Sequence, residues 1–124
     1  MNPLHRSSQI LSKVESKGFL EGIFALDTDW DAALNARDSG TFDEAWSASD
    51  AQVLSAHDST ESSVVLSLRE TVFKRVLSLT GSSEVAGYAS DDFGLIAKAA
   101  EAGLNIPFVD GLWNSYRDGF FPGG

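Results

Sequence analysis

The sequence has no cysteine and only two histidines, His5 and His57, among its 124 residues. Without cysteine, disulfide frameworks, thiolate metal sites and cysteine nucleophiles are excluded. Two histidines are too few for a histidine-built zinc site, so no metal is predicted. The two glycine-rich phosphate-binding motifs, Gly-x-x-x-x-Gly-Lys-Ser/Thr and Gly-x-Gly-x-x-Gly, do not occur, and we expect no cofactor. The absence of thiols fits a reducing compartment, so we expect a cytoplasmic protein.

Positive charge is also scarce, because 9 Lys and Arg stand against 18 Asp and Glu, which gives a net charge of −9. Binding to the phosphates of DNA or RNA requires basic side chains that replace counterions, and docking on anionic lipid requires them as well. Nucleic acid and membrane surfaces are therefore not expected partners. There is no apolar run long enough to span a membrane and no signal-peptide pattern. The length predicts a single helical domain over residues 1–124.

Apolar residues are spaced most regularly between residues 61 and 80. Val65, Leu68, Val72 and Val76 recur at intervals of three or four, which is typical of a helix with one buried face. Leu66 and Leu77 widen this face, and Gly81 is expected to end the helix. The sequence predicts a mainly α fold, an irregular bundle of five to seven short helices around a central helix at about 61–80.

Capping residues predict where the helices before residue 61 begin. Ser7 or Ser8 is expected to cap a first helix that ends at Gly18, and Thr28 a helix that reaches Arg37. Residues 19–26 suit either a buried strand or a short buried helix. Thr41 and Glu44 match a capping box at the start of a helix over 42–56. Its core face is expected to hold Phe42, Trp46, Val53 and Leu54.

After residue 81 the sequence predicts three further helices. Ser82 or Ser83 begins a short one that runs through Tyr88, and Ser90 caps the next, with Asp91 and Asp92 in its first turn. Pro107 fits the first turn of the last helix. Proline has no backbone N–H, and the N–H groups of the first turn have no partner within the helix in any case. Phe120 and Phe121, in the tail, are expected to fold back onto the body.

The negative charge is concentrated in one stretch. Between residues 27 and 61, nine acids stand against one base, Arg37. We interpret this stretch as a docking face for a basic protein partner, with Trp30 as an aromatic anchor; the alternative is a solvated surface that aids solubility. The candidate face comprises Asp27, Asp29, Trp30, Asp31, Asp38, Asp43, Glu44, Asp50, Asp58 and Glu61.

A second candidate surface combines aromatic and acidic residues of the C-terminal half. Aromatic side chains can form a ligand pocket or the centre of a protein interface, although they more often form plain core. The acidic turn that follows Tyr88 is likewise most simply a helix cap. The members of this set are Tyr88, Asp91, Asp92, Trp113 and Tyr116.

Two acidic motifs raise an enzymatic alternative. Asp27-x-Asp29 after the apolar residues 23–26 resembles the nucleophile segment of the haloacid dehalogenase phosphatases, and the pair Asp91-Asp92 is similar to their magnesium-binding acids. This resemblance implies a small Mg-dependent, carboxylate-based phosphatase built on a parallel sheet, with Asp27 as nucleophile and Asp29 as acid/base. The interval between the two motifs is helical in pattern, which departs from that family.

The profile of the whole chain is similar to that of small bacterial immunity proteins, which inhibit a cognate toxin. The length of 124 residues, the acidic helical body and the lack of cysteine carry the resemblance, together with segments 88–96 and 112–122. It implies a non-enzymatic inhibitor that occupies a basic surface of a toxin. The sequence leaves the oligomeric state open.

Overall fold

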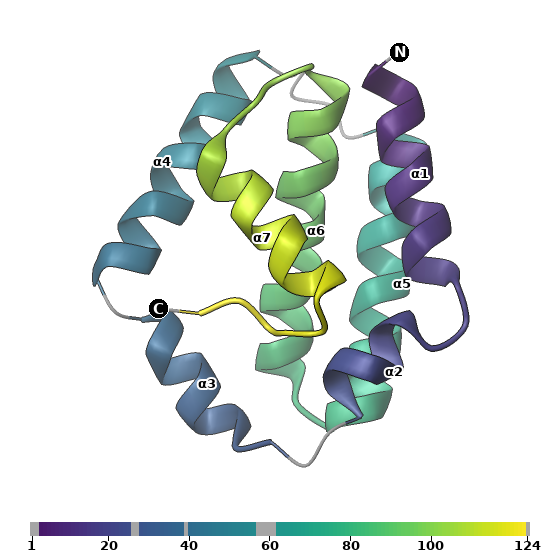
Figure 1. Cartoon of the computed structure of the whole chain (residues 1–124), viewed down its shortest axis with the longest axis vertical. Coiled ribbons are helices and arrows are strands. Elements are labelled where there is room, and N and C mark those ends of the chain that lie inside the picture. Colours follow the sequence, from purple (N-terminus) through teal and green to yellow (C-terminus); the bar gives the residue numbers. More distant parts are fainter. Residues whose placement is uncertain (1–2, 26–27, 39, 57–61, 124) are drawn as a thin grey trace.

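The computed structural model describes residues 3–25, 28–38, 40–56 and 62–123, and these residues form seven helices and no strand (Figure 1). The mainly α prediction is confirmed, and so is the helix at about 61–80. Within the described residues, none of the helices combines the length and the apolar character needed to cross a membrane.

Two long helices, α5 (Ser63–Thr80) and α6 (Ser83–Glu101), pack along each other as the central pair. A capping serine precedes each of them, Ser62 before α5 and Ser82 before α6. The side chain of each serine accepts a hydrogen bond from the backbone N–H three residues later. The turn between them is possible because Gly81 adopts a φ of 70°, which disfavours residues that carry a Cβ atom. The apolar stripe of α5, Val65, Leu68, Val72 and Val76, is buried in the core that this pairing helps to form.

The other helices surround this pair (Figure 1). Helices α1 (Pro3–Glu15) and α2 (Phe19–Phe24) pack against α5, and α1 also contacts α6. Helix α7 (Pro107–Arg117) crosses the front of α6 in the view of Figure 1. Helices α3 (Trp30–Arg37) and α4 (Gly40–Ala56) lie on the side of α7 opposite to α1, and α4 contacts both α6 and α7.

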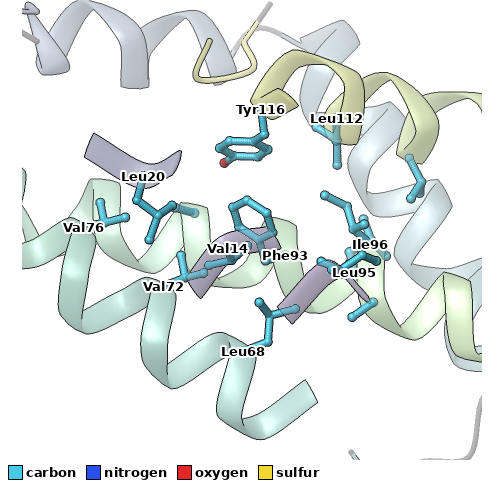
Figure 2. Close-up of a cluster of buried hydrophobic side chains, with 14 of the residues drawn as sticks. Val14, Leu20, Leu68, Val72, Val76, Phe93, Leu95, Ile96, Leu112 and Tyr116 are labelled. Atoms are coloured by element: carbon cyan, nitrogen blue, oxygen red, sulfur yellow. The ribbon is translucent and has the colours of Figure 1, made fainter. Parts of the chain in front are cut away.

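The core gathers around α6, which is buried on several of its sides. Val14 of α1, Leu20 of α2, Val72 of α5 and Tyr116 of α7 all meet near Phe93 of α6, and none of them is more than 1% exposed. Figure 2 shows the Tyr116 ring facing the Phe93 ring, and their centroids are 4.4 Å apart. Burial of each such side chain contributes about 1.5–3 kcal/mol, so this cluster fixes the positions of five helices.

Several predicted helix starts are wrong. Helix α1 begins at Pro3, so Ser7 lies inside it and is buried. Asp29, not Thr28, caps α3 by accepting the N–H of Ala32. Helix α4 begins at Gly40, which places Thr41 within its first turn and rules out the predicted capping box.

One open alternative and one further correction concern segments that tertiary contacts organise. Residues 19–24 form a helix, which settles the ambiguity left by their apolar run. Helix α6 continues without a break through Ser90, because the Ser90 hydroxyl donates to the backbone carbonyl of Arg69 on α5 and serves no cap. In the tail, Phe121 packs against Phe24 as expected, whereas Phe120 is 68% exposed.

The outer edges of two predicted apolar faces also lie in the solvent. Leu54 of α4 is 58% exposed, and Leu66 and Leu77 of α5 are 55% and 37% exposed. Of the four residues predicted for the core face of α4, Val53 is fully buried and Phe42 and Trp46 are half-buried, so three contribute to the core.

Candidate functional site

The acidic residues between 27 and 61 that the structure describes lie on α3, α4 and the residues that flank α3. Asp50 is half-buried, and Trp30 is half-buried with its ring against Phe24 and Phe121. Three predicted members, Asp27, Asp58 and Glu61, lie outside the described residues. The members of the face whose side chains are exposed are Asp29, Asp31, Asp38, Asp43 and Glu44.

The single base of this stretch is withdrawn from the surface. Arg37, in the last turn of α3, is 4% exposed and forms a two-pronged ion pair with Asp92 of α6, which is fully buried. Its two terminal nitrogens each lie 2.7 Å from one oxygen of that carboxylate. Arg37 also donates to the backbone carbonyl of Pro122 at 3.1 Å. The outward side of α3 and α4 is therefore acidic without a compensating base.

Two further side chains complete the bonding of Asp92. Trp46 of α4 donates its indole N–H to Oδ1 at 2.9 Å, and Tyr116 of α7 donates its hydroxyl to Oδ2 at 2.6 Å. Each carboxylate oxygen thus accepts two hydrogen bonds, which is what a charge needs when it is taken out of water. The cluster Arg37–Asp92–Trp46–Tyr116, called here the buried ion cluster, joins α3, α4, α6 and α7.

Burial and charge act together on the groups of this cluster. Burial alone would lower the pKa of Arg37, but the hydrogen bonds and the charge of Asp92 outweigh it and raise that pKa above its usual value. Burial raises the pKa of Tyr116 well above its usual value, and the negative charge of Asp92 raises it further. At neutral pH the arginine is charged and the phenol keeps its proton.

Three aromatic rings surround the guanidinium of Arg37. Its carbon lies 4.8 Å from the ring centroids of Phe42 and Phe121 and 5.1 Å from that of Tyr88. Stacking of this kind suits arginine because its planar cation is weakly hydrated. One nitrogen, Nε, is buried without a hydrogen-bond partner among the described residues.

The second predicted set divides into surface and core. Tyr88 is 39% exposed, and Asp91 is exposed and pairs with Arg69 at 3.0 Å. Partial burial raises the pKa of Asp91, and the charge of Arg69 opposes this rise. Asp92 and Tyr116 belong to the interior, and Trp113 is half-buried with its ring against Phe19 and Phe93.

One hollow brings members of the two predicted sets together. Its volume is about 220 Å³, and it lies where α3, α4 and α6 meet. Asp38 and Asp43 from the first set and Tyr88 and Asp91 from the second all line it, together with Arg37. The other lining residues are Phe42, Trp46 and Ser47.

The phosphatase alternative does not find its framework in this fold. No strand occurs in the described ranges, so the parallel sheet on which that active site depends is missing from them. Asp92, its expected magnesium ligand, has both oxygens engaged by Arg37, Trp46 and Tyr116. Across the same ranges, no three His, Asp or Glu side chains lie close enough together to hold a metal ion.

Sequence reasoning missed the role of Arg37, which it treated only as the exception in an acidic stretch. The signal that points to a buried pair is the combination of that lone base with an acid that a largely apolar run follows, as residues 93–97 follow Asp92. Because the two partners are 55 residues apart, no local periodicity links them.

Comparison with known proteins identifies one family. The family described as Immunity protein PIM1 matches residues 9–123, which is nearly the whole chain. A comparison with curated proteins finds no match.

Proposed function

The chain belongs to the Immunity protein PIM1 family, and from this premise we propose that it neutralises a cognate toxin by binding it, without catalysing a reaction itself. The toxin surface that it covers is basic. The contact is made by the acidic residues of α3, of α4 and of the positions that flank α3, which we call the acidic face. Because an inhibitor of this kind acts by occupancy, it needs a surface that fits the toxin but no cofactor.

One observation carries the choice of this surface. Arg37, which could neutralise the acids around it, is buried and paired with Asp92, while Asp38 and Asp43 on either side of the α3–α4 junction are exposed. The buried ion cluster therefore does two things. It holds α3 and α4 against α6, and it removes the only positive charge of the stretch from the side that meets solvent.

Charge of one sign on one face acts mainly on the rate of association. It steers an oppositely charged partner into the correct orientation, and its acids then pair with Lys and Arg across the interface. A toxin that acts on an anionic substrate holds it with basic side chains. An acidic face that covers those side chains blocks the substrate both sterically and by taking its charge partners.

The test uses, as the toxin, the protein encoded by the open reading frame next to the gene of this chain. Purified toxin and chain are mixed, and the association rate is measured by stopped-flow or surface plasmon resonance at salt concentrations from 50 mM to 1 M. We expect the rate to fall steeply as salt rises, since screening shortens the range of the attraction. An unchanged rate over this range would show that the acidic face does not steer binding.

A matched pair of variants separates the acidic face from the overall charge. Asp38→Asn/Asp50→Asn removes two acids of the face, whereas Glu15→Gln/Asp118→Asn removes two acids elsewhere and changes the net charge equally. At 50 mM salt the first should slow association by about three- to tenfold, a modest part of the acceleration that steering can provide. The second should slow it less than twofold. Equal effects would contradict the proposed face.

A further inference from the structure

A groove on another side of the molecule differs in charge from the acidic face. It has a volume of about 490 Å³ and lies between α1, the C-terminal part of α6 and α7. Its floor is apolar, because Ile10 and Ile96 are buried and Trp113 is half-buried. Figure 1 shows α1 on one side of α7 and α3 and α4 on the other, and the groove has lining residues on α1 but none on α3 or α4.

The rim of the groove concentrates positive charge. Arg6 and Lys13 of α1 and Arg117 of α7 line the groove and are exposed, and Asp110 is the only acid among its described lining residues. Three of the nine bases of a chain with a net charge of −9 are therefore gathered at one site. In the described part of the chain, neither Arg6 nor Arg117 has an acidic side chain within ion-pair distance. Their charge is available to a partner.

The dimensions of the groove fit a short helix. Arg6 and Lys13 are seven residues apart on α1, and Val109 and Arg117 are eight apart on α7. At a rise of about 1.5 Å per residue, the lined segments are roughly 10–12 Å long, or two helical turns. An amphipathic helix binds to such a groove through apolar side chains at positions i, i+3 or i+4, and i+7.

We propose that this basic-rimmed groove is a second docking site of the chain and that it binds an acidic amphipathic helix of the cognate toxin. The helix places its apolar stripe over Ile96 and Trp113 and its Asp or Glu side chains beside Lys13 and Arg117. This inference rests on the proposed function, because the toxin supplies the helix. Two docking sites of opposite sign fix the orientation of the toxin, since a reversed complex would bring like charges together.

A second copy of this chain is a less suitable occupant. Two molecules that each carry a charge of −9 repel one another, and the repulsion is strongest at the low salt where the groove attracts acids most. Association of an acidic face with a groove of another copy would also be head-to-tail, so it would form rings or filaments and not a symmetric dimer.

The first experiment tests the groove without the toxin. The probe is a fluorescein-labelled 15-residue helical peptide with Leu at i, i+3, i+4 and i+7 and Glu on the flanking positions, compared with the same peptide carrying Gln for Glu. Binding is followed by fluorescence anisotropy at 50 mM salt, with sedimentation velocity to detect self-association. We expect the Glu peptide to bind at least about tenfold more tightly than the Gln peptide, because only the former pairs with the basic rim.

Two variants locate the binding in the groove. Lys13→Glu/Arg117→Glu should lower the affinity for the Glu peptide at least about tenfold, because this double variant places like charges together. Ala100→Phe fills the groove sterically and should weaken both peptides. Lys17→Glu, which changes charge outside the lining residues, serves as the control and should change affinity less than threefold. Circular dichroism of each variant confirms that it is folded. Equal affinity for the two peptides, an equal effect of the control, or self-association in place of peptide binding would overturn the proposal.

The second experiment measures the affinity of the toxin for the same variants. Weaker binding by Lys13→Glu/Arg117→Glu than by Lys17→Glu supports the groove as part of the interface. Equal binding by these two variants overturns the inference and leaves the acidic face in place. If the unaltered chain does not bind the toxin, the proposed function fails, and with it the toxin as the source of the helix, whatever the peptide shows.

Discussion

Asp92 owes its position in the core to four hydrogen bonds, two on each carboxylate oxygen. A buried charge is tolerated when its partners are complete and becomes costly when one of them is removed. The partners differ in kind, since Arg37 supplies a countercharge and Tyr116 supplies a neutral hydroxyl. Substitutions of the two should therefore have different effects on stability.

We expect Arg37→Met to lower the free energy of unfolding by about 3–5 kcal/mol, because it leaves the Asp92 carboxylate buried without a counterion. Tyr116→Phe should cost about 1.5–3 kcal/mol, because it removes one hydrogen bond to a charged group. Both values follow from urea unfolding monitored by circular dichroism. Lys74→Met, which breaks an exposed pair with Glu70, is the control and should leave stability nearly unchanged. A ranking in which Tyr116→Phe costs more than Arg37→Met would contradict this account.

The same cluster predicts how stability changes at alkaline pH. The pKa of Tyr116 is raised in the folded state. The protonated phenol therefore makes its full contribution to the free energy of unfolding below about pH 10, the usual pKa of tyrosine. This contribution is lost as the pH rises above that value. In the Tyr88→Phe variant, Tyr116 is the only tyrosine. We expect its absorbance at 295 nm to rise only when circular dichroism reports unfolding. Ionisation near pH 10 in a still-folded chain would show that the phenol is not held by Asp92.

At the scale of the helices, the sequence predicts best what depends on neighbouring residues. Gly81 ends α5 and Pro107 begins α7 as expected, because a positive φ and a missing N–H are local requirements. The predicted break at Ser90 is wrong for the opposite reason. A serine followed by two acids is typical of a helix start, yet here the serine bonds to α5 and Asp92 bonds to α3, α4 and α7. Those partners are distant in sequence.

Two glycines of α6 give a matched test of how closely it packs on α5. A Cβ atom at Gly87 would meet nothing within 4 Å, whereas at Gly94 it would lie 2.9 Å from Cδ of Arg69. Gly87→Ala should raise the free energy of unfolding by about 0.5–1 kcal/mol, because alanine loses less backbone freedom in a helix. Gly94→Ala should not show this increase, since the Arg69 side chain must move away from the new methyl group and thereby leave Asp91. Thermal unfolding of both variants measures the difference. Equal stabilisation by the two substitutions would show that Arg69 moves aside at little cost in free energy.

At the scale of the whole molecule, the sequence predicts only part of the distribution of charge over the surface. The run of acids predicts an acidic region, and the exposed acids of α3 and α4 lie where their helices leave them in solvent. The burial of Arg37 could not be predicted, because it depends on Asp92, 55 residues later in the chain. The groove rim combines Arg6, Lys13 and Arg117 from opposite ends of the sequence, so no local charge count indicates it.

An acidic face kept for binding should reduce the stability of the free protein. Asp38 follows the C-terminus of α3, the negative pole of that helix, and Asp50 adds charge to an already acidic α4. We expect Asp38→Asn/Asp50→Asn to raise the free energy of unfolding at 10 mM salt and to lose most of this gain at 1 M salt, where repulsion is screened. Urea unfolding at the two salt concentrations measures both effects. The same double variant should associate more slowly with the toxin, so that its two substitutions move stability and binding in opposite directions. If it proves less stable at low salt, these acids support the fold, and the acidic face loses its main argument as a surface kept for a partner.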